Sequence, residues 1–274
     1  MISLIQLGTI DYATGLALQQ KLVALRKEDK IGDVLLLLEH KPVITLGRNA
    51  KAANVVASAE LLNQRGVELY ECDRGGDVTF HGPGQIVGYP IFDLRRFAHS
   101  SNSQTLSSRA EPRDLGLDAR KHIGVVEFVR RLEDVLMRTC ADFAIPTKRI
   151  AGLTGVWTDP INTSHIGAAA PEAKLAAIGV HISRFVTSHG FALNVNPDLS
   201  YFNLIIPCGI SSKPVTSLQR ELGHLVDFNA VAESLSRNFG TVFQSQILWV
   251  EALDDLRVAV PNGELAKREA LNRG

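Results

Sequence analysis

Residues 74–85 read Arg-Gly-Gly-Asp-Val-Thr-Phe-His-Gly-Pro-Gly-Gln, and they form the densest unusual stretch of this 274-residue chain. The four glycines let a backbone turn sharply and approach a ligand closely. Arg74 could meet a carboxylate or a phosphate, and His81 lies where a strand gives way to the turn. Spacing alone leaves two interpretations open: a ligand-binding loop, or a hairpin with ordinary turn glycines. A nucleotide-binding P-loop is excluded because no Gly-Lys-Ser or Gly-Lys-Thr follows.

A second informative region consists of two segments, 174–183 and 188–195, that alternate like paired strands. Small residues fall on one face of each segment, Ala177 and Gly179 in the first and Gly190 and Ala192 in the second. If the two small faces coincide, they form a trench floored by backbone in which an extended apolar chain could lie. A one-residue slip in register would destroy it. The alternative is that these small residues let a helix pack closely.

The rest of the chain mixes strand and helix patterns. Helices are predicted over 11–27, over 124–143 with an apolar stripe that includes Val125 and Cys140, from Thr216, and from a cap at Asp227. Strands are predicted over 34–38, 43–46, 77–80 and 86–94. This pattern predicts an α/β (α+β) fold of mixed β-sheets flanked by helices. We expect a single catalytic domain over 1–261, surface insertions near 97–120 and 162–172, and a polar tail over 262–274.

Composition excludes several classes of function. The 29 Lys and Arg residues balance the 29 Asp and Glu residues, which argues against bulk binding to nucleic acid or to an anionic membrane. The start of the chain lacks the features of a secretory signal, and no run reaches the roughly 18 apolar residues of a membrane span. We therefore expect a soluble, cytoplasmic protein.

The three cysteines differ in their sequence surroundings. Their odd number and the absence of Cys-x-x-Cys argue against a disulfide framework or a cysteine zinc site. Cys140 falls on the apolar helix stripe, and Cys72 lies between two acidic residues that discourage a thiolate. Cys208 follows a strand-like run into a loop and is the best candidate nucleophile of the three. The histidines lack metal-ligand spacing, so no metal and no cofactor are expected.

Taken together, these stretches resemble the lipoyl(octanoyl) transferases, a family of the biotin/lipoate-protein ligase superfamily. The resemblance is carried by residues 74–85, Gly88-Tyr89-Pro90, Asp93-Leu94, Gly155-Val156-Trp157, 174–179, 189–194 and Pro207-Cys208-Gly209. It implies the ligase-like fold with no cofactor. It also implies transfer of octanoyl from acyl carrier protein, through a cysteine thioester, to a lysine of a lipoyl domain. The acceptors would be the lipoyl domains of 2-oxoacid dehydrogenase E2 subunits and the glycine cleavage H protein.

The resemblance also assigns roles to residues. It implies that Cys208 is the nucleophile and that Lys174, a lysine at the start of an apolar strand, is paired with it. The residues that it implies for substrate binding are Arg74, Gly75, Gly76, Asp77, Val78, Thr79, Phe80, His81, Ala177, Ile178, Gly179, Gly190, Phe191 and Ala192. Arg95, Arg96, Lys148 and Arg149 are candidates for a basic surface that docks the acidic carrier protein, or are plain solvated charges.

Three other activities remain as alternatives. One is an ATP-dependent lipoate-protein ligase of the same fold, which would not need Cys208. Another is a thioester hydrolase, which would release free octanoate. The last is a non-catalytic acyl-binding module, which would leave Cys208 unmodified.

Overall fold

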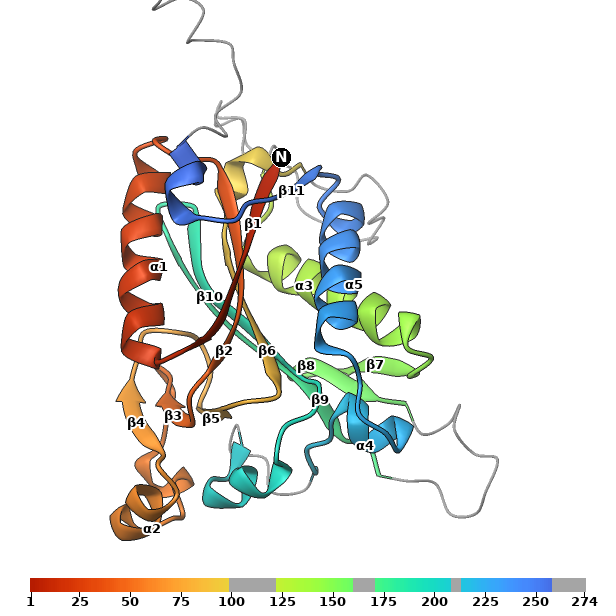
Figure 1. The fold of residues 1–274 in the computed structure, drawn as a ribbon. Coiled ribbons are helices and arrows are strands. Elements are labelled where there is room, and N and C mark those ends of the chain that lie inside the picture. The colour runs from red at the N-terminus through yellow and green to blue at the C-terminus, as the bar shows by residue number, and fades with distance from the viewer. Residues whose placement is uncertain (99–121, 160–170, 208–212, 258–274) are drawn as a thin grey trace, which may run out of the picture.

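A large mixed β-sheet forms the centre of the computed structural model, which describes residues 1–98, 122–159, 171–207 and 213–257. Its eight strands lie in the order β11-β1-β2-β6-β10-β9-β8-β7 (Figure 1). They are β1 (Ile2–Ile10), β2 (Asp33–His40), β6 (Gln85–Ile91), β7 (Thr147–Ile150), β8 (Leu153–Thr158), β9 (Lys174–Ser183), β10 (Val186–Asn194) and β11 (Ile247–Trp249). β1 pairs in parallel with β2 and β11, and the remaining pairs are antiparallel.

Helices cover both faces of this sheet. In Figure 1, α1 (Tyr12–Lys27) lies on one face, and α3 (Val125–Asp142) and α5 (Phe228–Val242) lie on the other. The central strand β2 contributes to both cores, because Leu35 and Leu37 face α3 and α5 whereas Leu36 and Leu38 face α1. Such a continuous apolar run is typical of a strand that is buried on both sides.

A second, three-stranded sheet stands beside the first. Its strands are β3 (Val43–Leu46), β4 (Glu68–Glu71) and β5 (Val78–His81), in the order β4-β3-β5. The shorter elements are α2 (Ala59–Gln64), α4 (Leu218–Leu222), and the 3₁₀ helices η1 (Ala52–Asn54), η2 (Leu94–Arg96), η4 (Leu199–Leu204) and η6 (Leu253–Arg257). A small core joins this sheet to η4, where Phe80 stacks on Tyr201 at 4.8 Å between ring centroids.

Of the two interpretations left open for residues 74–85, the hairpin does not hold, because β5 pairs with β3 while β6 pairs with β2 and β10, and these residues link two sheets. Most predicted elements are confirmed, and two details are wrong. Val125 opens α3 with 50% of its surface exposed, because it lies in the first turn and off the apolar stripe. The cap of α4 is Ser217, whose side chain accepts a hydrogen bond from the backbone N–H of Arg220, and not Thr216.

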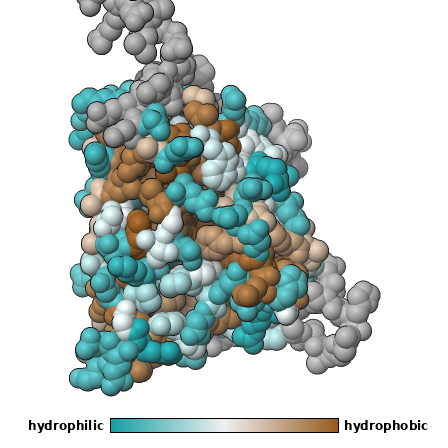
Figure 2. Space-filling model, in the orientation of Figure 1, coloured by the Kyte–Doolittle hydropathy of each residue, from teal (hydrophilic) through white to brown (hydrophobic). Residues whose placement is uncertain are grey.

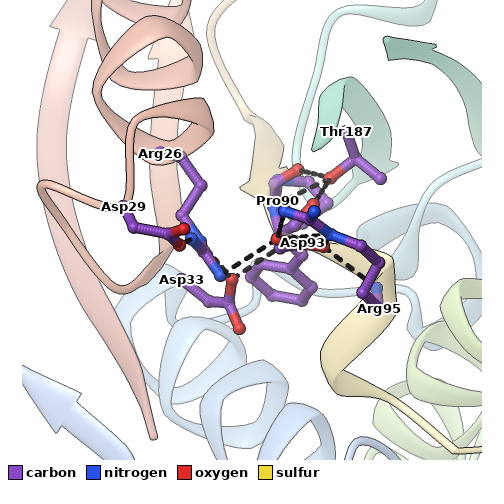
Figure 3. Close-up of polar contacts among 8 residues, drawn as sticks. Arg26, Asp29, Asp33, Pro90, Asp93, Arg95 and Thr187 are labelled. Carbon is purple, nitrogen blue, oxygen red and sulfur yellow. Dashed lines mark hydrogen bonds and ion pairs between the residues drawn. The ribbon is translucent and has the colours of Figure 1, made fainter. Parts of the chain in front are cut away.

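A buried ionic network fixes α1 to the large sheet (Figure 3). Arg26, 1% exposed, donates from Nε to Asp33 at 2.8 Å and from Nη1 to the exposed Asp29 at 2.6 Å. Asp33 also accepts the backbone N–H of Asp93, and Asp93 in turn holds Arg95. Three segments that are distant in the sequence are thereby joined by charge-assisted hydrogen bonds.

The surface is mixed in hydropathy. Figure 2 shows hydrophilic side chains interspersed with hydrophobic areas on the face in view. Among the described helices, none is long and apolar enough to span a bilayer. The insertion expected near 97–120, apart from its first two residues, the segment 162–170 and the tail over 262–274 lie outside the described residues.

Candidate functional site

The register between β9 and β10 brings the small residues together. Gly179 lies opposite Gly190, and Ala177 lies opposite Ala192, so the trench expected from the sequence is confirmed. The glycines allow close contact between segments of backbone. A Cβ on Gly190 would lie 2.0 Å from the carbonyl oxygen of Gly88, and one on Gly179 would lie 2.6 Å from that of Gly75. Gly179 therefore admits the loop onto the sheet, Gly190 lets β10 approach β6 closely, and α1 also packs on this face, where Ala192 shares a core with Leu22.

A cavity of about 50 Å³ occupies this trench. The loop at 74–77 and strand β5 cover it, since Gly75 donates its N–H to the carbonyl oxygen of Val180 at 3.0 Å. Its lining residues are Tyr12, Arg74, Gly75, Gly76, Asp77, Thr79, His81, Val87, Tyr89, Ala177, Ile178, Gly179, His189, Gly190, Phe191 and Ala192. Twelve of the fourteen residues that the resemblance implies for substrate binding thus gather around one space. The two others, Val78 and Phe80, point into the small core beside η4.

Arg74 is the most unusual charge of the cavity. Only 7% of it is exposed, and its guanidinium donates to the hydroxyl and carbonyl oxygens of Thr45 and to the carbonyl oxygen of Gly75. Among the described residues, no carboxylate lies within 4.0 Å of it. The register between β3 and β5 supplies this arrangement, because it places Thr45 opposite Thr79 at the cavity wall.

Several residues in and behind the cavity were given no site role from the sequence. Tyr12 comes from α1 and Tyr89 from β6, and behind them the Tyr89 hydroxyl meets Nε2 of His40 at 2.6 Å. Nδ1 of His40 lies 3.1 Å from the carbonyl oxygen of Ile10, so Nδ1 carries the proton and Nε2 accepts from Tyr89. An aromatic residue in a buried strand is not itself a signal for a site, so only the fold brings these residues together.

The ionisable groups around the cavity favour their neutral forms. Burial lowers the pKa of His40 to about 4 and, together with the charges of His40 and Arg74, lowers the pKa of His81 well below its usual value. Burial also raises the pKa of the Tyr89 hydroxyl. The pKa of His189 is lowered by burial, although its Nε2 lies 2.7 Å from Asp73. Among the described residues, burial thus favours the neutral forms of these histidines and of Tyr89 beside the buried guanidinium of Arg74.

A second, narrower cavity adjoins the first and holds Lys174. The two share Thr79, Ala177 and Ala192 as lining residues. Lys174 is 7% exposed, and its Nζ lies 4.8 Å from the centroid of the Trp157 ring, a favourable cation–π distance. Gly155, at φ +126°, leaves room for this side chain, since a Cβ there would lie 3.3 Å from Lys174 Cε.

Cys208 lies outside the described residues. The residues that flank this part of the sequence reach the surroundings of Lys174: Pro207 lines the second cavity, and Lys213 Nζ lies 5.9 Å from the centroid of the Trp157 ring. Cys140 is fully buried in the core, and burial raises the pKa of its thiol to about 12. Cys72 is partly buried, and its thiol donates to the carbonyl oxygen of Leu46.

Two further sets of residues can be placed. In the described part of the chain, no group of three or more His, Cys, Asp and Glu residues could hold a metal ion. Among the four candidates for a basic dock, Arg95 pairs with Asp93, Lys148 with Glu172, and Arg149 with Glu133. Arg96 lies at the rim of a separate cavity. Three of these four cations are thus already compensated within the chain.

The chain matches known proteins over most of its length. The family model of the lipoyl protein ligase A/B catalytic domain covers residues 11–110 and 115–240. A relative named octanoyltransferase from Koribacter versatilis is 58% identical over 93% of this chain and 90% of its own length. Another from Acidobacterium capsulatum is 52% identical over 93% of this chain and 96% of its own length. The bipartite lipoate protein ligase of Thermoplasma acidophilum shares the fold, with a TM-score of 0.62 over 98% of this chain and 91% of its own, at 13% identity.

Proposed function

The chain belongs to the octanoyltransferases of the lipoyl protein ligase A/B family, and we propose that it transfers octanoyl through a thioester on Cys208 with the help of Lys174. The family assignment makes it an acyltransferase of lipoate biosynthesis. One observation supports the finer proposal most strongly. The small-residue trench continues into the cavity that Lys174 and Pro207 line, so an apolar chain and a reacting carbonyl have adjacent places.

The trench suits the octanoyl chain. Val87, Ala177 and Ala192 offer apolar side chains to an extended chain, and Ile178 and Phe191 contribute backbone, since their side chains belong to the core on the other face of the sheet. Each buried CH₂ contributes about 0.8 kcal/mol of binding free energy. The substrate-binding residues are then those that line this cavity, with Val78 and Phe80 supporting it from behind.

Lys174 supplies the proton transfers of the two steps. In the first step, the Cys208 thiolate attacks the carbonyl carbon of the octanoyl thioester; the C–S bond to the donor breaks, and the departing thiolate takes a proton from the Lys174 ammonium. In the second step, the amine of the acceptor lysine attacks the Cys208 thioester and loses a proton to Lys174, and the Cys208 thiolate leaves. A thioester and an amine become an amide and a thiol, so no ATP is consumed.

The Trp157 ring supports this role of Lys174. A cation over an indole face is held in place, and an ammonium next to a thiol favours its thiolate. The surroundings of Lys174 are largely closed, since its backbone N–H and C=O pair with Pro214 and Thr216. These contacts fix residues 214–216, just after the segment that contains Cys208, against β9.

The donor and the acceptor follow from the same proposal. We take octanoyl-acyl carrier protein as the donor and a lipoyl domain, of a 2-oxoacid dehydrogenase E2 subunit or of the glycine cleavage H protein, as the acceptor. The related Thermoplasma acidophilum ligase was described together with its E2 lipoyl domain. The cytoplasm is the compartment proposed for this reaction.

The test is intact-mass spectrometry after incubation with octanoyl-carrier protein, without ATP. The wild-type chain and the control Cys72→Ser should gain one octanoyl group and lose it when a lipoyl domain is added, while Cys208→Ala should gain none. An octanoyl adduct on Cys208→Ala would overturn the nucleophile assignment. Transfer that requires ATP would point to a ligase, loss of the adduct without an acceptor would point to a hydrolase, and binding without an adduct would point to a silent module.

The role of Lys174 has its own measurement. Alkylation of Cys208 followed against pH should show a higher thiol pKa in Lys174→Ala than in the wild type. The exposed Lys30, paired with Glu28, provides the control variant Lys30→Ala. Equal profiles in the wild type and Lys174→Ala would refute the role proposed for Lys174.

A further inference from the structure

The acyl cavity has a direction. Its small-residue pairs follow one another along β9 and β10, first Ala177 with Ala192 and then Gly179 with Gly190. Lys174 lies at the start of β9, so the glycine pair marks the end far from the reacting carbonyl. Residues two apart in a strand are separated by about 7 Å. An eight-carbon chain with its seven C–C bonds of about 1.5 Å is at most about 10 Å long. A chain that begins beside Ala177 therefore ends next to the glycine pair.

Arg74 lies at this far end. A Cβ on Gly179 would lie 3.3 Å from Arg74 Cδ and 3.7 Å from Nη1, so the missing side chain makes room for the arginine. Gly76 and Gly47 surround the same Nη1, where a Cβ would lie 3.4 Å and 2.7 Å away. The guanidinium is held by Thr45 and Gly75, which are neutral acceptors. A buried positive charge thus stands at the end of the trench whose floor is made by Ala177, Ala192 and the glycine pair.

The other groups at this end do not neutralise Arg74. Asp77 accepts hydrogen bonds from the backbone N–H groups of Lys51 and Val78 and from the Asn54 amide. Asp73 is directed to His189 at 2.7 Å and to His181 at 3.5 Å. A buried atom among the described residues that line this cavity, His81 Nδ1, has no hydrogen-bond partner. The far end is therefore polar, cationic and only partly satisfied.

We propose that Arg74 is a specificity-determining residue that recognises the far end of the acyl chain, admitting chains of about eight carbons and accepting an eight-carbon chain that ends in a carboxylate. This inference rests on the proposed acyl cavity and adds a substrate class to it: ω-carboxyl acyl groups of medium length. A longer alkyl chain pushes its last carbons against the guanidinium and excludes water from it, which disfavours binding. A terminal carboxylate of the right length instead forms a charge-assisted pair with Arg74.

The experiment compares small thioester donors, whose orientation is fixed because the thioester must reach the reacting position. Octanoyl, decanoyl and 7-carboxyheptanoyl N-acetylcysteamine thioesters are given to the full chain with a lipoyl domain, and kcat/KM is measured for each. The variants are Arg74→Met, which removes the charge, and Arg74→Lys, which keeps it. Octanoyl transfer by the wild type tests the proposed function, while the ratios between donors test this inference.

In the wild type, decanoyl should react at least about tenfold more slowly than octanoyl, although its two extra CH₂ groups would favour it about tenfold in an unrestricted apolar pocket. The carboxylated donor should stay within about tenfold of octanoyl, whereas an apolar pocket would reject a carboxylate by roughly 1000-fold or more. In Arg74→Met the decanoyl-to-octanoyl ratio should rise about tenfold and the carboxylated donor should lose about 100-fold, while Arg74→Lys should retain the carboxylated donor.

Two results would overturn the inference while octanoyl transfer stands. One is a kcat/KM of the wild type for the carboxylated donor that is more than about tenfold below that for octanoyl. The other is an unchanged set of ratios in Arg74→Met. If Arg74→Met does not fold, the kcat/KM values of the wild type for the three donors still test the inference. Loss of all octanoyl transfer in the wild type would overturn the proposed function and this inference together.

Discussion

The ionic network around Arg26 provides a sharp test of how the sheet and α1 are held together. The change is Asp33→Asn, which removes one negative charge from the 1% exposed Arg26. The matched control is Asp29→Asn, which removes the other close carboxylate of the same guanidinium but at a side chain that is 75% exposed. Asn suits both positions, and in particular Asp29 at φ +53°, where an alanine would add backbone strain.

The expected magnitudes differ because burial differs. Removing one partner of a buried pair costs about 3–5 kcal/mol. Arg26 keeps Asp29 at 2.6 Å and the buried Asp93 at 3.5 Å, which favours the lower end of this range. Asp33 also accepts the backbone N–H of Asp93, so its loss disturbs the start of η2 as well as α1. Asp33→Asn keeps an acceptor oxygen, which also favours the lower end, about 3 kcal/mol. An exposed pair such as that of Asp29 contributes about 0.2–1 kcal/mol.

The assay is equilibrium urea unfolding of the two variants and the wild type at neutral pH. Asp33→Asn should lower the midpoint at unchanged m-value, by at least three times the shift of Asp29→Asn. Equal shifts for the two variants, or a smaller shift for Asp33→Asn, would refute the argument that burial of the network determines its contribution.

Three further predictions concern residues near the cavities. Gly155 has φ +126°, and in Gly155→Ala the new Cβ would lie 2.6 Å from the carbonyl oxygen of Ala176. The variant should lose about 2–4 kcal/mol of unfolding free energy in urea, and a loss below about 1 kcal/mol would contradict this. Burial lowers the pKa of His40 to about 4, so near pH 6.5 the unfolded chain takes up a proton at this residue and the folded chain does not. The free energy of unfolding should therefore fall as the pH decreases from about 6.5 to 4. In thermal unfolding, His40→Gln should show a weaker pH dependence than the wild type. Trp157→Leu removes the ring over Lys174 and should lower kcat/KM for octanoyl transfer by about 3–30-fold with little change in KM; an unchanged kcat would contradict it.

Much of the fold could be predicted because its patterns are local. The alternation in 174–183 and 188–195 predicts two strands, and the structure pairs Gly179 with Gly190 in the register that forms the trench. Asp11 and Asp227 predict helix starts because a cap is a contact over three residues or fewer. The division of β5 and β6 between two sheets could not be predicted, because it depends on a distant contact: Gly84 donates to Glu39 and accepts from Val195.

The candidate site was predictable in part for the same reason. The loop at 74–77 and the two small-residue strands are unusual in the sequence itself, and the structure brings them together at the first cavity. Tyr12, His40 and Tyr89 are ordinary residues of buried elements, and only the stacking of α1, β2 and β6 makes them neighbours. Cys208 was singled out by its sequence and family resemblance, and its role stays a prediction that the mass measurement will test.

The glycines of the two regions have one physical role in common. The loop glycine Gly75 contacts the strand glycine Gly179 so closely that a Cβ on Gly179 would meet the loop's carbonyl oxygen at 2.6 Å. Without that contact the loop could not lie on β9, and Arg74 would not be buried at the end of the trench. A substitution at Gly179 should therefore alter the far end of the acyl cavity before it alters the surroundings of Lys174, five residues away along the strand. Chain selection and chemistry are thus separated along one strand, which is why donor ratios and octanoyl transfer can be tested independently.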